Sequence, residues 1–72
     1  MRASWTDTQG RKIVLTDIEN IRECWDDCIE FRSREQSSMN LFIDDEEIIK
    51  GGCFKESCRF IDSQIVLSAD KE

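Results

Sequence analysis

The chain has 72 residues, with 10 lysines and arginines against 16 aspartates and glutamates, and it contains no histidine, tyrosine or proline. The missing histidine excludes Ser-His and Cys-His nucleophile pairs, histidine-ligated metal sites and a histidine general base. The net charge of -6 argues against direct binding to nucleic acid or to an anionic membrane, because both need a basic patch.

The length predicts a single domain, residues 1–72, with a small core. General surface scaling predicts that folding buries only about 62% of the unfolded chain's surface. A disulfide, a bound metal or a binding partner would therefore help to stabilise the fold. Residues 1–9 contain no apolar run, which predicts a chain without a signal peptide, and no stretch resembles a membrane span. We therefore expect a cytoplasmic protein with its cysteines in a reducing environment.

A β-hairpin is expected at the N-terminus, from residues 4–7 and 12–16. The segment Thr8-Gln9-Gly10 supplies a turn, and Ile13-Val14-Leu15 has the composition of a strand. Trp5 in the first strand is either a core anchor or an exposed contact residue, because tryptophan is common in both settings.

A helix is expected over residues 17–34. Thr16 stands three residues before Glu19, which is the capping-box spacing, and Asp17 places a negative charge in the first turn. At 100° intervals, the apolar side chains fall within an arc of roughly 100°. This apolar set is Ile18, Ile21, Trp25, Cys28 and Ile29, with Cys24 and Phe31 at one edge. The pattern predicts an amphipathic helix that ends near residues 34–38.

The second half of the chain is expected to form strands. Residues 39–43 and 48–49 flank an acidic turn, and Gly51-Gly52 interrupts the returning strand. Residues 58–61 and 64–68 have strand composition, and residues 69–72 are expected to fray. The order is ββα followed by a meander of two to four strands. This order predicts an α+β fold, in which one amphipathic helix covers one face of a small antiparallel sheet.

Three interpretations of the cysteines stay open. Cys24, Cys28, Cys53 and Cys58 could hold a tetrahedral zinc ion, but neither pair has the two-residue spacing of a zinc knuckle. They could form disulfides in an oxidising compartment, or act as small buried hydrophobes. The spacing and the expected compartment favour thiols, so we expect no metal and no cofactor.

Two groups of carboxylates are the candidate binding residues. The helical wheel places the first group opposite the apolar arc: Glu19, Glu23, Asp26, Asp27 and Glu30. Like charges four residues apart in a helix cost about 0.2 to 0.5 kcal/mol per pair, so this face suggests a binding role. A solvated face that keeps a small protein in solution is the alternative. The second group is the turn Asp44, Asp45, Glu46 and Glu47, which lacks the ligand pattern of a calcium loop.

The sequence therefore predicts a small, acidic, non-enzymatic protein-binding module. It would dock its carboxylates on the basic surface of a nucleic-acid-handling partner, as an inhibitor or modulator. Such an array can occupy a groove that normally holds phosphates, which is how a DNA mimic acts. Small acidic antagonists encoded by phages and mobile elements provide an analogy of size and charge only.

Two alternatives from other classes stay open. One is a zinc-stabilised or disulfide-stapled structural module, and the other is a self-associating subunit, such as a homodimer paired through exposed sheet edges. An enzyme is not expected, because a core this small has little room for a pocket with tuned carboxylates.

Overall fold

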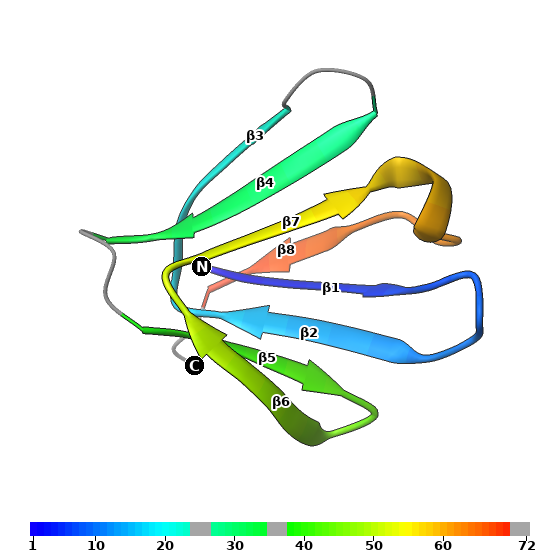
Figure 1. Ribbon diagram of the computed structural model, residues 1–72, viewed down its shortest axis with the longest axis horizontal. Coiled ribbons are helices and arrows are strands. Elements are labelled where there is room, and N and C mark those ends of the chain that lie inside the picture. The colour runs from blue at the N-terminus through cyan, green and yellow to red at the C-terminus, as the bar shows by residue number, and fades with distance from the viewer. Residues whose placement is uncertain (24–26, 35–37, 70–72) are drawn as a thin grey trace.

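The computed structural model describes residues 1–23, 27–34 and 38–69, and these residues form two antiparallel β-sheets (Figure 1). The strands are β1 (Arg2–Thr6), β2 (Lys12–Thr16), β3 (Ile18–Glu23), β4 (Cys28–Ser33), β5 (Met39–Ile43), β6 (Glu46–Gly51), β7 (Cys53–Ser57) and β8 (Val66–Ser68). One sheet has the order β6-β5-β2-β1-β8, and the other has the order β3-β4-β7. A short 3₁₀ helix, Cys58–Phe60, follows β7.

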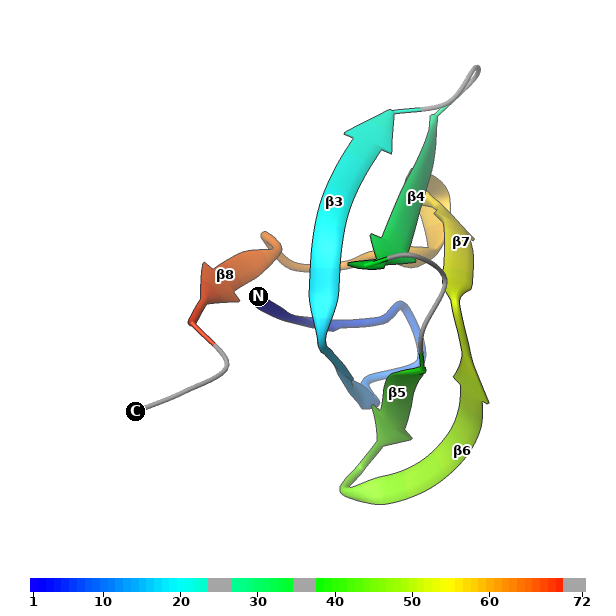
Figure 2. The same ribbon diagram turned by 90° about the vertical axis from the view of Figure 1, so that its left-hand side faces the viewer.

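Two sharp bends carry the chain from one sheet into the other. Asp17 alone separates β2 from β3, and its φ of 63° lies in the left-handed region, which aspartate tolerates better than most residues. Gly52 alone separates β6 from β7. In the view of Figure 2, β3, β4 and β7 run across the direction of β1. The two sheets therefore face each other around a shared core.

The core lies between the inner faces of the two sheets. Its buried residues are Ala3, Trp5, Ile13, Leu15, Ile18, Phe31, Met39 and Leu41. Trp5 of β1 stacks on Phe31 of β4, with ring centroids 5.3 Å apart and an interplanar angle of 12°. Phe54 of β7 packs against both rings, at 6.4 Å and 6.2 Å. Trp5 is therefore a core anchor, and aromatic contacts join the five-stranded sheet to the three-stranded one.

The predicted α+β fold with a helix over residues 17–34 is wrong. The described part of this segment forms the antiparallel hairpin of β3 and β4, in which Ile21 pairs with Phe31 and Glu23 pairs with Ile29. Cys24, Trp25 and Asp26, which the helical wheel used, lie outside the described residues. Among the described residues, no helix has the length and hydropathy needed to cross a membrane.

Charge and side-chain alternation explain why the hairpin forms instead. A helix would place Glu19 beside Glu23 and Glu23 beside Asp27, whereas the hairpin places Arg22 directly opposite Glu30. Along β4, Phe31 is fully buried in the core while its neighbour Glu30 projects to the other face of the sheet. The apolar residues at 29 and 31 fit this two-residue period as well as they fit a helix.

Most of the strands predicted on either side of this segment are present in the structure. The N-terminal hairpin is confirmed by β1 and β2, in which Trp5 pairs with Ile13, and the acidic hairpin is confirmed by β5 and β6. Gly52 does interrupt the returning strand. The strand predicted over 58–61 is wrong, because the Ser57 hydroxyl accepts a hydrogen bond from the Arg59 amide and starts the 3₁₀ helix. Within 64–68, only residues 66–68 form a strand.

The aromatic contact between the sheets leads to a stability prediction. Phe31→Ala should lower the free energy of unfolding by about 3 to 5 kcal/mol, because it leaves a cavity between Trp5 and Phe54. Phe60→Ala is the control, since that ring is half exposed, and it should cost less than about 1 kcal/mol. Urea unfolding followed by circular dichroism measures both. Equal losses would contradict the assignment of Phe31 to the core.

Candidate functional site

The first group of predicted carboxylates does not form a common face. Glu23 lies opposite Ile29 and Glu30 lies opposite Arg22, so these two side chains project from opposite faces of the hairpin. Glu19 is half exposed and forms an ion pair with Arg34 over 3.3 Å. Asp27 is exposed beside the start of β4, and Asp26 lies outside the described residues. The described members of the predicted stripe therefore do not share one surface.

The second group does stay together. Asp44 and Asp45 form the two-residue turn between β5 and β6, and Glu46 and Glu47 begin β6. All four residues are exposed. We call this set, Asp44, Asp45, Glu46 and Glu47, the acidic tip.

The acidic tip has a defined backbone. Asp44 and Asp45 have φ angles of 53° and 70°, which is the positive-φ pattern of the tight turns that match the twist of a hairpin. The Asp44 amide donates to the Lys12 carbonyl over 2.8 Å, and the Lys12 amide donates to Asp44 Oδ1 over 2.9 Å. The turn is thereby attached to β2. Aspartate suits both turn positions, so only Glu46 and Glu47 add charge that the turn does not need.

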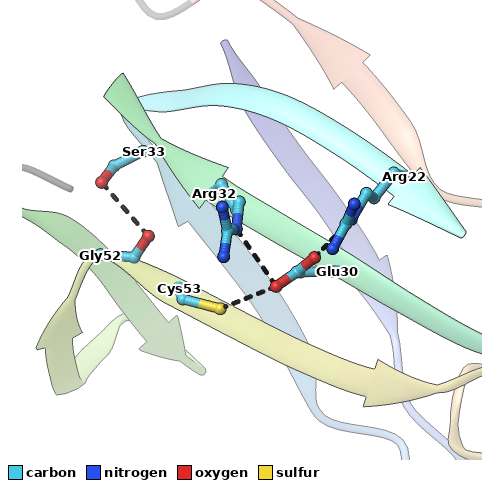
Figure 3. A network of polar contacts seen from close by, with 6 residues as sticks. All are labelled: Arg22, Glu30, Arg32, Ser33, Gly52 and Cys53. Atoms are coloured by element: carbon cyan, nitrogen blue, oxygen red, sulfur yellow. Dashed lines mark hydrogen bonds and ion pairs between the residues drawn. The ribbon is translucent and has the colours of Figure 1, made fainter. Parts of the chain in front are cut away.

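One carboxylate of the first group, Glu30, lies buried on the outer face of the three-stranded sheet, and the sequence pattern did not predict this burial. Glu30 is only 2% exposed. Its Oε1 accepts a hydrogen bond from Arg22 Nε over 2.7 Å, and its Oε2 accepts one from Arg32 Nε over 3.2 Å. The Cys53 thiol donates to the same Oε2 over 3.3 Å (Figure 3). Three donors from three strands therefore converge on one carboxylate.

These contacts keep Glu30 ionised. The hydrogen bond from Arg22, followed by that from Cys53, outweighs burial and lowers the pKa of Glu30 from 4.5 to about 2, with a further contribution from Arg32. Lys55 of β7 also lies directly opposite Glu30 in the strand register. We call the set Arg22, Arg32 and Lys55, with Glu30 at its centre, the basic face.

The sequence does contain a signal for the basic face. Residues 28, 30 and 32 alternate with residues 29, 31 and 33, so a strand would place Glu30 and Arg32 on one face and the apolar side chains on the other. The helical wheel instead grouped Glu30 with the other acids. The pairing with Arg22 depends on the register of the hairpin, which no local pattern gives.

Two further carboxylates have shifted pKa values. Burial raises the pKa of Asp7, but hydrogen bonds from the Arg11 amide and side chain and from the Gln9 amide hold it below its ordinary value. These bonds, at 2.8 to 3.0 Å, fasten the turn between β1 and β2. Burial raises the pKa of Glu56, and the charge of Asp7 adds to this effect.

The zinc interpretation gains no support from the described residues. Within residues 1–23, 27–34 and 38–69, no group of three or more cysteines or carboxylates is placed to hold a metal ion. Cys28, Cys53 and Cys58 are thiols. Cys24 lies outside the described residues.

A shallow hollow on the outer face of the five-stranded sheet has a volume of about 310 Å³. Ser4, Thr6 and Ser63 line it together with Lys12, and none of the described lining residues is a carboxylate. The Ser63 hydroxyl already accepts a hydrogen bond from the Thr6 amide over 2.7 Å.

Comparison of the chain with protein-family models, with curated proteins and with solved structures finds no match.

The lowered pKa of Glu30 predicts a pH-dependent contribution to stability. Because the folded state binds this proton less tightly than the unfolded state, the ionised carboxylate stabilises the fold above about pH 4.5, and the contribution is lost as the pH falls toward 2. Glu30→Gln should destabilise the protein at neutral pH, and the difference from the wild type should shrink toward pH 2. Urea unfolding at a series of pH values measures this difference.

Glu19→Gln is the matched control for this experiment. Its ion pair with Arg34 joins two exposed side chains, so its loss should cost less than about 1 kcal/mol. A difference between wild type and Glu30→Gln that stays constant between pH 5 and pH 2 would contradict the role of Glu30.

Proposed function

We propose that the protein is a small non-enzymatic binding module that docks its acidic tip on the basic surface of a nucleic-acid-handling partner protein, as an inhibitor or modulator. The observation that carries the proposal is the set of four consecutive exposed residues, Asp44 to Glu47, on a turn hydrogen-bonded to β2. This surface is narrower than the sequence pattern predicted, because the described carboxylates of the first group lie on or directly beside the other sheet.

The physical case rests on charge density and on a fixed backbone. Four like charges within four residues give a strong local field, which speeds the encounter with a basic surface and weakens as salt is added. The turn loses little conformational freedom on binding, because Asp44 is already held by Lys12.

An apolar contact is available beside the charges. Ile48 follows Glu47 in β6 and is 50% exposed, and β6 is an edge strand of the five-stranded sheet. Interfaces combine an apolar centre with a polar rim, so Ile48 supports the choice of this end of the molecule.

The proposal predicts that removing charge from the acidic tip will weaken partner capture. The triple variant Asp45→Asn, Glu46→Gln and Glu47→Gln reduces the net negative charge from -6 to -3. Asparagine at position 45 tolerates the positive φ of the turn as aspartate does. Loss of three interface charges should weaken binding roughly ten-fold, mainly by slowing association. Capture from an extract of the source cells, with stepwise salt elution and mass spectrometry, measures retention.

The control variant removes the same charge from other places. Glu23→Gln, Asp27→Asn and Asp62→Asn also gives -3, and all three residues are exposed away from the acidic tip. A nucleic-acid-binding protein held by the wild type and by this control, but released from the tip variant, supports the proposal. Equal loss from both variants would show that net charge alone acts, and the proposal would be wrong.

Self-association is a second candidate function, and strand β8 favours it. This strand lies at the other edge of the five-stranded sheet, and its Val66 and Leu67 are 59% and 52% exposed. Apolar edge strands pair readily with a second copy unless a charge blocks them.

Self-association through β8 predicts a dimer mass in light scattering of the wild type. Leu67→Lys should shift the protein to the monomer, because a lysine on an edge strand opposes pairing. A wild type that stays monomeric at millimolar concentration would rule this candidate out.

A further inference from the structure

The outer face of the three-stranded sheet gathers three cations in a molecule whose net charge is negative. The strand register places Arg22, Glu30 and Lys55 in one row across β3, β4 and β7. Arg32 lies two residues along β4 from Glu30 and therefore projects from the same face. Three cations therefore lie around one carboxylate, in a chain whose net charge is -6.

The arginines of this face are held in position. Each guanidinium meets the buried Glu30 carboxylate through its Nε atom, as Figure 3 shows. The Arg22 and Arg32 side chains nevertheless remain 66% and 50% exposed, so both still reach solvent. Burying a carboxylate costs free energy because the charge loses its contact with water. Here the buried Glu30 carboxylate fixes the Arg22 and Arg32 guanidinium groups beside each other.

From this arrangement we propose that the basic face binds a compact phosphate group, either inorganic phosphate or a phosphate monoester. A phosphate monoester carries a charge of about -1.5 to -2 at neutral pH, and this compact charge suits a face on which cations outnumber the single carboxylate. Guanidinium groups donate several hydrogen bonds in a fixed plane and suit phosphate oxygens. Lys55 supplies a third cation from β7, which lies on the other side of β4 from Arg22.

The same face is poorly suited to a nucleic-acid chain. The aromatic residues of these strands, Phe31 and Phe54, pack in the core between the sheets, so neither is available on the outer face to stack on a base. The net charge of -6 also repels an extended polyanion more than a single phosphate. The observations therefore favour a small ligand with one phosphate group.

The test is a titration of the wild-type protein with inorganic phosphate, followed by nuclear magnetic resonance at constant pH and ionic strength. Contacts of phosphate with the exposed side chains of Arg22, Arg32 and Lys55 should give a dissociation constant of about 10 mM for the complex. Saturable shifts of the Arg22, Arg32 and Lys55 amides are expected with phosphate and with glycerol phosphate. Chloride at the same ionic strength should not produce them.

Variants separate this site from general charge effects. Lys55→Gln should weaken phosphate binding about three-fold, and it leaves the three donors to Glu30 in place. Arg32→Lys keeps the charge but loses the guanidinium, and it should also weaken binding. Lys12→Gln removes a cation from the other sheet and should have no effect.

Three results would overturn the proposal. These are equal shifts with phosphate and chloride, equal loss in Lys55→Gln and Lys12→Gln, and shifts caused by an oligonucleotide but not by a monoester. The acidic-tip triple variant should bind phosphate as the wild type does, so this inference and the proposed partner binding can fail independently.

Discussion

The contact of Trp5 with Phe31 and Phe54 is the interaction on which the rest of this structure depends. A chain of this length buries little surface, so the inner faces of its two sheets must cover each other. The stacked pair at 5.3 Å, with Phe54 beside it, joins β1 of one sheet to β4 and β7 of the other. The sharp bends at Asp17 and Gly52 let the same chain supply both sides of that contact.

The position of Phe31 also determines the chemistry of the outer surface. Side chains alternate along a strand, so a buried Phe31 directs Glu30 and Arg32 outward on the middle strand of the sheet. On that face Glu30 has a cationic neighbour on each side, Arg22 and Lys55, and its pKa falls to about 2. The carboxylate that the sequence placed among binding residues thus positions two arginines.

Charge is separated over the length of the molecule. The acidic tip lies at the turn of the β5–β6 hairpin, and the basic face lies on the sheet of β3, β4 and β7, away from that turn in both views (Figures 1 and 2). The two surfaces therefore cannot neutralise each other within one molecule. The charged side chains are therefore unevenly distributed, with four acids at the tip and three cations around Glu30 on the other sheet.

The sequence by itself determined the features that depend on neighbouring residues. The turns at Gly10 and at Asp44-Asp45, the strands beside them and the break at Gly52 were all predictable, because turn chemistry and β-branched runs act locally. The segment 18–33 was not predictable in this way, since its apolar spacing fits both a helix and a pair of strands. Only the tertiary structure decided between them. Burial of Phe31 against Trp5 joins residues from different sheets, and the pairing of Arg22 with Glu30 depends on the register of the hairpin, so both contacts exist only once the sheets have formed.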